Sequence, residues 1–184
     1  GLPALLVDVR IADANDVELP RGTVGEVQIR GPNIMLGYWN LPDASAAALR
    51  DGWYHSGDGG TMDEDGYVYI VDRFKDMIIS GGENIYSAEV ESAISTLDGV
   101  AEVAVIGIPD EIWGEAVHAI VVPRPGRKIT PDAVIAHCRT LIAGYKIPRS
   151  VGIRAESLPL SGAGKVLKTV LREPFWVGRS KQVS

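Results

Sequence analysis

The hydrophobic pattern of the chain changes at Asp72, and this change limits the folds that the sequence can adopt. Before Asp72 the apolar residues form short segments, and residues 25–30 alternate between apolar and polar side chains. A period of two indicates a strand with one buried face. After Asp72, segments with helical spacing alternate with apolar runs that are typical of strands. The pattern therefore predicts an α+β chain, in which a β-rich first part precedes an α+β domain of about 110 residues, a common domain size.

The first part is expected to consist of strands and turns. Residues 5–11 have the composition of a strand, and Pro42 opens a short helix that is rich in alanine. Residues 62–70 are typical of a hairpin that turns at Asp65-Gly66.

The second part is expected to contain helices packed on strands. Val90 and Ile94 recur at helical spacing behind Ser87, which is the expected N-cap of the first helix. A second helix is predicted from its N-cap Thr130 to Gly144, which ends it. The other expected elements are strands at residues 101–108, 116–122 and 151–155 and a short helix that begins near Lys165.

Composition argues against several classes of function. A net charge of -6 and a pI near 5.1 do not suit a nucleic-acid or anionic-membrane partner, which requires clustered Lys and Arg. No apolar run approaches the length of a transmembrane helix, and no signal peptide opens the chain. The single Cys138 cannot form an internal disulfide, which fits a reducing cytoplasm, and its helical surroundings favour a buried thiol over a nucleophile.

Three segments in the middle of the chain carry chemically useful residues, although each has a simpler explanation. Residues 55–60 place Asp58 among glycines, where its carboxylate can accept two hydrogen bonds from a diol. Taken alone, this segment is more typical of a glycine-rich turn. Residues 71–79 place charges between two apolar runs, as a functional connection or a solvated linker would. Residues 80–86 contain adjacent glycines that leave room for a narrow ligand, but they also fit a tight turn before a helix.

A fourth segment, residues 159–166, is similar to a phosphate-binding loop but does not match its pattern. That pattern needs a glycine where Pro159 stands and a Ser or Thr where Val166 stands. Lys165 on this glycine-rich loop can still reach an anion and neutralise developing charge. A solvated surface lysine is the simpler explanation. We assign no metal ligand within the chain.

In their order and spacing, these segments together resemble the later core motifs of the adenylate-forming superfamily. This superfamily contains acyl- and aryl-CoA synthetases, peptide-synthetase adenylation domains and beetle luciferases. The resemblance covers nearly the whole chain. The motifs that carry it are Gly37-Tyr38-Trp39, His55-Ser56-Gly57-Asp58, Asp72-Arg73-Phe74-Lys75-Asp76, Ser80-Gly81-Gly82-Glu83-Asn84-Ile85-Tyr86 and Ser161-Gly162-Ala163-Gly164-Lys165.

The resemblance implies a two-step reaction and a role for single residues in it. A carboxylate attacks the α-phosphate of ATP, and the thiol of CoA then displaces AMP from the acyl-adenylate. Asp58 matches the aspartate that binds the ribose hydroxyls, Arg73 matches the arginine that supports the ribose and phosphates, and Ile70 belongs to the same nucleotide site. Lys75 occupies the hinge position, which is often aspartate in relatives. Lys165 matches the lysine that bridges the substrate carboxylate and the α-phosphate.

The resemblance also implies a site for CoA on the second part of the chain. A glycine pair and its neighbours match the segment that lines the pantetheine tunnel, and an aromatic and a basic stretch match CoA contacts. The residues implied are Ser80, Gly81, Gly82, Glu83, Trp113, Tyr145 and Lys146. Trp113 also has a simpler explanation, since an aromatic residue in such a loop is often a packing residue.

The domain organisation follows from the same resemblance. Residues 1–72 are expected to be the β-rich end of a large AMP-binding N-terminal domain, residues 73–75 the hinge and residues 76–184 the lid domain. The acyl pocket, the phosphate-binding loop and the magnesium-binding glutamate of the family precede these motifs, so Mg²⁺ would be held by residues outside this chain. The fragment alone is therefore expected to be inactive.

Two other functions stay open at this point. The chain can belong to an enzyme that loads a carrier protein instead of CoA, or to a non-catalytic module that binds a nucleotide or CoA. A fatty acid is the favoured substrate because residues 171–176 resemble the end of bacterial fatty-acid-type ligases. The sequence leaves the oligomeric state open, a homo-oligomer included.

Overall fold

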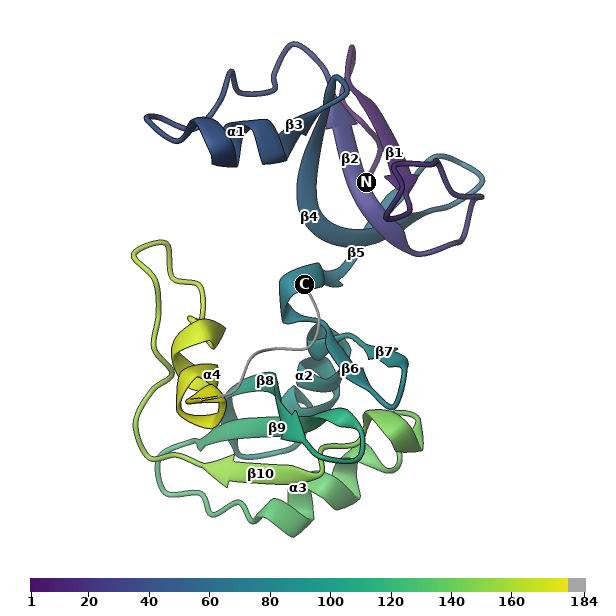
Figure 1. The fold of residues 1–184 in the computed structure, drawn as a ribbon. Helices are drawn as coiled ribbons and strands as arrows, with labels where there is room; N and C mark the ends of the chain where they lie inside the picture. The colour runs from purple at the N-terminus through teal and green to yellow at the C-terminus, as the bar shows by residue number, and fades with distance from the viewer. Residues whose placement is uncertain (179–184) are drawn as a thin grey trace. The chain divides into compact units, whose positions relative to one another are not determined.

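The computed structural model describes residues 1–178 and divides into two compact units, Gly1–Lys75 and Asp76–Ser184 (Figure 1). Each unit has a sheet and a hydrophobic core of its own. The α+β class that the sequence predicts is confirmed. The division falls at the end of the predicted hinge, residues 73–75, and the movement of that hinge stays a prediction. Among the helices described, none combines the length and the apolar composition that a membrane span needs.

The first unit is built on a five-stranded sheet in which all pairs are antiparallel. Strand β4 pairs with β2, β3 and β5, and is therefore the central strand. Ile11 of β1, Val27 of β2 and Met62 of β4 form the buried core of this unit. The elements are β1 (Asp8–Ala12), β2 (Gly25–Arg30), α1 (Pro42–Ala48), β3 (Leu49–Arg50), β4 (Trp53–Met62) and β5 (Val68–Arg73).

Two expectations for this unit have different outcomes. The first strand begins at Asp8 and not at Leu5, because Leu5 and Leu6 are exposed and Leu6 has a φ of 63°, outside the strand region. The predicted hairpin is confirmed, since β4 and β5 are antiparallel neighbours and Met62 pairs with Val68.

The second unit is a mixed sheet with helices on both faces. Strands β8 and β9 form a long antiparallel hairpin, and β10 joins β9 in parallel. The sheet order is β10-β9-β6-β7, with β8 beside β9. The elements are β6 (Ile78–Ser80), β7 (Glu83–Ile85), α2 (Ser87–Ser95), β8 (Val100–Asp110), β9 (Gly114–Pro123), α3 (Pro131–Cys138), β10 (Ser150–Ile153) and α4 (Lys168–Trp176), with short 3-10 helices η1 (Phe74–Asp76) and η2 (Gly144–Lys146).

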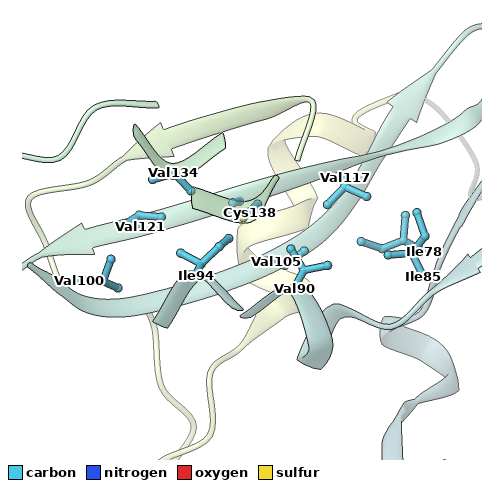
Figure 2. Packing of buried hydrophobic residues seen from close by; sticks show 11 residues of the cluster. Ile78, Ile85, Val90, Ile94, Val100, Val105, Val117, Val121, Val134 and Cys138 are labelled. Atoms are coloured by element: carbon cyan, nitrogen blue, oxygen red, sulfur yellow. The ribbon is translucent and has the colours of Figure 1, made fainter. Parts of the chain in front are cut away.

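The two faces of this sheet have separate cores because successive side chains of a strand point to opposite sides. In β8, Val105 belongs to the cluster with α2 and α3, whereas Ile106 belongs to the cluster with Leu171 of α4. Figure 2 shows the first cluster, in which Cys138 lies among the buried aliphatic side chains. The predicted buried thiol is confirmed, and its burial raises the pKa of Cys138.

The predicted N-cap of the first helix in this unit is wrong. Helix α2 begins at Ser87 itself, and Tyr86 is the residue at the N-cap position. Ser87 is fully buried, and its hydroxyl accepts a hydrogen bond of 2.6 Å from the amine of Lys168. A partner 81 residues along the chain therefore determines the role of this serine.

The second predicted helix begins as expected but ends early. The side chain of Thr130 caps α3 by accepting a backbone N–H, which confirms this N-cap. The helix then ends at Cys138 and does not continue to Gly144. The backbone N–H and the hydroxyl of Thr140 both donate to the carbonyl of His137, which closes a tight turn in place of another helical turn.

Candidate functional site

Asp58 and Arg73 form an ion pair across the two strands at the centre of the first unit. They are register partners on β4 and β5, and Oδ1 of Asp58 lies 3.3 Å from Nε of Arg73. Their side chains are 34% and 44% exposed, so an outside molecule can reach both. The structure therefore brings together two of the residues that the sequence assigns to a nucleotide site. The third, Ile70, lies on β5 and is exposed.

Asp58 stands on an interruption of β4. Residues 56–58 lie opposite Val27 alone, so β4 carries two extra residues that leave the regular ladder. Gly57 has a φ of 71°, a left-handed conformation that glycine adopts without a steric cost. A bulge of this kind changes the direction in which a side chain points. The glycine next to Asp58 is thus needed for the backbone shape and need not face a ligand.

Tyr54, to which the sequence assigned no role, interacts electrostatically with this pair. The side chain of Tyr54 hydrogen-bonds to Tyr38. Burial raises the pKa of Tyr54, and the bond to Tyr38 and the negative charge of Asp58 act in the same direction. Tyr38 belongs to a quoted motif, whereas the interaction of Tyr54 with Asp58 is visible only in the structure.

Lys165 lies on an ordered turn of the second unit. The N–H of Ser161 donates to the carbonyl of Lys165 at 2.7 Å, and the hydroxyl of Ser161 accepts the N–H of Lys165 at 3.2 Å. A bridge between Leu160 and Val166 closes the base of the turn. The side chain of Lys165 is exposed. The loop is therefore more defined than its glycine content suggests, and it presents one amine to solvent.

Lys168 lies three residues further on, in a different environment. The short helix predicted to begin near Lys165 is present, and Lys168 is its first residue. Its amine lies 2.6 Å from the hydroxyl of Ser87 and 2.7 Å from the carboxylate of Glu91, and its side chain is 13% exposed. Glu91 also accepts the N–H of Val105. Lys168 thus connects α4 to α2, and Glu91 of α2 in turn binds β8.

We expect Lys168→Ala to lower the free energy of unfolding by roughly 1–3 kcal/mol, because it removes the largely shielded ammonium group that binds the Ser87 hydroxyl and the Glu91 carboxylate. Lys165→Ala is the matched control, and its exposed side chain predicts a change within about 0.5 kcal/mol. Denaturant-induced unfolding of the two variants measures this difference. Equal stability of the two variants would contradict the anchoring role of Lys168.

The glycine pair lies at the turn of a β-hairpin. Ser80 of β6 pairs with Glu83 of β7, and Gly81 and Gly82 between them have φ values of 61° and 85°. The tight turn expected here is present, but it joins two strands that the sequence analysis did not predict. The four residues assigned to a CoA site from this segment thus belong to one hairpin.

Trp113 packs directly on this turn. Its carbonyl accepts the N–H of Gly81 at 2.9 Å, and a Cβ on Gly81 would lie only 2.5 Å from Cε3 of the indole. The guanidinium of Arg149, which the sequence analysis did not select, lies 5.1 Å from the centre of the same ring. Asp110 accepts the N–H groups of Trp113 and Ile112, and these bonds lower the pKa of Asp110. The structure therefore brings Gly81 and Trp113 together beside a cation.

The remaining predicted CoA residues, Tyr145 and Lys146, lie in η2. Tyr145 is half exposed, at 51%. The amine of Lys146 donates to both carboxylate oxygens of Glu89 at 2.7 Å, and these bonds raise the pKa of Lys146. Glu89 already balances the charge of this lysine, so a phosphate group would have to compete with that carboxylate.

Lys75, the predicted hinge residue, lies in η1 between the last strand of the first unit and β6. The division between the two units falls directly after it. This is the position that a hinge requires, and its role stays a prediction.

One group among the described residues has the spacing of a metal site. Carboxylate oxygens of Asp16 and Glu26 and a ring nitrogen of His55 lie within 4.8 Å of one another. However, the amide nitrogen of Gln28 lies 2.6 Å from Asp16, and the guanidinium of Arg50 lies 2.9 Å from His55. Because these nitrogens are hydrogen-bond donors, the group is a hydrogen-bonded network that does not fit Mg²⁺.

Comparison with known proteins identifies the class to which this fold and these residues belong. Residues 89–165 match the family described as the AMP-binding enzyme C-terminal domain. This match covers the turn of Lys165 and most of the second unit. The chain belongs to the adenylate-forming superfamily and corresponds to a C-terminal portion of its acyl-CoA synthetases.

Individual relatives extend the similarity to the first unit. The chain is 51% identical, over 95% of its length, to a feruloyl-CoA synthase of an Amycolatopsis species. It is 44% identical over its whole length to the fatty acid--[acyl-carrier-protein] ligase ScoC of Streptomyces coeruleorubidus. ATP-bound MatB from Rhodopseudomonas palustris has a similar structure, with a TM-score of 0.88 and 40% identity over 95% of this chain. The chain spans 35% of the length of each of these three proteins.

Proposed function

We propose that this chain is the C-terminal part of an ATP-dependent carboxylate–CoA ligase. In the first step an oxygen of the substrate carboxylate bonds to the α-phosphorus of ATP, and pyrophosphate leaves. In the second step the CoA thiol loses its proton, its sulfur bonds to the acyl carbon, and AMP leaves with the electrons of the broken bond. The observation that carries the proposal is the accessible Asp58–Arg73 pair in a chain that is 51% identical to a CoA ligase.

Asp58 and Arg73 are proposed to bind the nucleotide. A carboxylate accepts hydrogen bonds from the two hydroxyls of a ribose, and the neighbouring guanidinium donates to phosphate or ribose oxygens. Their partial exposure and their placement on paired strands support these two binding roles. Ile70, exposed on β5, offers an apolar surface to the same nucleotide.

Lys165 is proposed to act in the first step. Two anions, the substrate carboxylate and the α-phosphate, have to approach each other, and a cation between them lowers their repulsion and stabilises the transition state. The ordered turn of Ser161 and Lys165 supports this role, because it restricts the backbone from which the amine extends.

The hairpin of Gly81 and Gly82, with Trp113 packed on it, is proposed to bind CoA in the second step. A surface without side chains lets the narrow pantetheine arm approach the backbone, and an indole offers a flat face to an adenine ring. Ser80, Glu83, Tyr145 and Lys146 are proposed to surround this site. The lid would turn about Lys75 between the two steps, so that Lys165 serves the first step and the hairpin serves the second. Hinge movements of this kind occur in other enzymes.

Three further assignments depend on the same proposal. Mg²⁺ would be held by residues outside this chain, and no step above passes through it. The negative net charge and the single buried cysteine support a cytoplasmic location. A fatty acid is the first substrate class to test, because the relative ScoC is described as a fatty acid ligase, although the feruloyl-CoA synthase acts on an aromatic acid by its name.

A second candidate function has a specific observation in its favour. ScoC is described as a fatty acid--[acyl-carrier-protein] ligase, and it is 44% identical to the whole of this chain. The thiol acceptor would then be the phosphopantetheine of a carrier protein and not free CoA. Both acceptors end in the same thiol arm, so the hairpin of Gly81 and Gly82 does not distinguish them.

The test is the release of AMP by the longer enzyme with ATP and a panel of fatty and aromatic acids, with and without CoA. The proposal expects turnover that requires CoA and yields an acyl thioester. Accumulation of acyl-adenylate without an effect of CoA would overturn it, and turnover restored by a phosphopantetheinylated carrier protein would support the second candidate. The 184-residue chain alone is the control, and it is expected to give no ATP–pyrophosphate exchange.

A further inference from the structure

We infer that Glu26 is a positioning residue for Asp58. Its carboxylate holds the bulge of residues 56–58 in β4, and the bulge sets the direction in which Asp58 points. The inference rests on the proposed function in one respect, namely that Asp58 binds the ribose of ATP.

Glu26 holds the bulge through Oε1 of its carboxylate. Oε1 accepts the N–H of Gly57 at 3.0 Å, and Oε2 lies 2.9 Å from Nδ1 of His55. The N–H of Gly57 lies in the segment that leaves the ladder between β2 and β4, and Glu26 supplies an acceptor for it there. The side chain of Glu26 is only 19% exposed, so solvent contributes little to this contact.

Ser56 completes the support from the other side of Gly57. Its hydroxyl donates to the carbonyl of Val27 at 2.6 Å and accepts the N–H of Asp58 at 3.1 Å. The backbone of Asp58 is therefore fixed by one side chain within the bulge and one side chain from β2. Glu26 and Ser56 act on the two consecutive N–H groups of residues 57 and 58.

Glu26 is itself held in place by a buried neighbour. Gln28 is fully buried, and its amide nitrogen lies 3.1 Å from Oε2 of Glu26. The amide oxygen of Gln28 accepts a hydrogen bond of 2.8 Å from Arg10, whose guanidinium lies 4.2 Å from the ring centre of Trp53. Connected polar groups of this kind are rigid when each member is satisfied. The orientation of Glu26 is therefore fixed before a nucleotide arrives.

This arrangement matters for binding because a small displacement of a binding group is costly. A misplacement of about 1 Å can reduce activity on the order of 100-fold. Asp58 has to keep its distance to Arg73 while it accepts hydrogen bonds from a ligand. Because β4 has two extra residues here, the position of Asp58 depends on the side chains of Glu26 and Ser56. A regular strand would not need Glu26, whereas this bulge does.

The experiment measures the KM for ATP of the longer enzyme in a double-mutant cycle. We expect Glu26→Ala to raise this KM by roughly tenfold, with a smaller change in kcat, which corresponds to about 1.4 kcal/mol of binding. The double variant Asp58→Ala/Glu26→Ala should be no worse than Asp58→Ala, because Glu26 acts only through Asp58. Glu26→Gln, which keeps an oxygen acceptor for Gly57, should restore most of the affinity.

The matched control is Asp8→Ala, which removes an exposed ion pair of 2.8 Å with Arg30 from the same sheet. It should leave the KM for ATP unchanged. If Glu26→Ala does not fold, Ser56→Ala replaces it in the same cycle, since Ser56 holds the next N–H of the bulge.

The two hypotheses fail in different ways. If Asp58→Ala itself leaves the KM for ATP unchanged, the proposed nucleotide site is wrong. If Asp58→Ala raises the KM while Glu26→Ala and Ser56→Ala do not, or if the effects of Asp58 and Glu26 multiply, Glu26 does not position Asp58 and the inference is overturned.

Discussion

Lys165→Ala is expected to reduce the rate of acyl-adenylate formation by about 10²–10³-fold, the usual effect of removing one group that stabilises developing charge. The reason is that the amine of this ordered turn is the cation proposed to lie between the carboxylate and the α-phosphate. ATP–pyrophosphate exchange by the longer enzyme measures this step directly. The formation of thioester from supplied acyl-adenylate should change much less, because that step does not bring two anions together.

Lys128→Ala is the control for the charge alone. Lys128 is another exposed lysine of the second unit, and its removal should leave the exchange rate unchanged. Exchange by Lys165→Ala at the rate of the unchanged enzyme would contradict the catalytic role of Lys165.

Gly81→Ala is expected to raise the KM for CoA by at least about tenfold, while adenylate formation stays nearly constant. The new Cβ would meet Cε3 of Trp113 at 2.5 Å, so the indole has to move away from the hairpin. The left-handed backbone at Gly81, with a φ of 61°, adds roughly 1–2 kcal/mol of strain for any residue with a Cβ. Thioester formation at varied CoA concentration, compared with pyrophosphate exchange, measures the two half-reactions separately.

Gly82→Ala separates the steric effect from the backbone strain. Gly82 also has a positive φ, of 85°, but a Cβ there would meet no atom within 4 Å. Its substitution should therefore weaken CoA binding less than that of Gly81. If Gly82→Ala has the larger effect, the contact between Gly81 and Trp113 is not what shapes the site, and if neither variant changes the KM for CoA, the hairpin does not bind CoA.

The fold was predictable where local signals decide it and unpredictable where distant partners do. Thr130 was expected to cap a helix and does so, because the groups that it bonds lie within one turn of it. Ser87 was expected to do the same, but Lys168 binds its hydroxyl and the helix starts one residue earlier than a cap there allows. The short strands β6 and β7 were missed because each has only three residues, too few for a period of two to be visible.

In the candidate site, too, residues within motifs could be predicted, whereas residues that act through distant contacts could not. Motifs were sufficient to select Asp58 and Arg73, and the structure pairs them. Tyr54, Arg149 and Glu26 were not selected, since each becomes significant only through the register of a strand or a contact with a distant residue. The shielding of Lys168 could not be predicted, because its partners Ser87 and Glu91 lie far from it in the sequence.

Helix α4 follows both strands of the β8–β9 hairpin in the chain, and this order has a consequence for biosynthesis. Leu171 of α4 completes the cluster on one face of the β8–β9 hairpin, together with Ile106 and Ile120. A ribosome makes both strands before this helix, so the apolar face stays uncovered until α4 emerges. The turn of Lys165 directly precedes α4 and is closed by its own hydrogen bonds. A nascent polypeptide would therefore form this turn, with the lysine proposed to act in adenylation, after the β8–β9 hairpin has been made and just before that hairpin is covered.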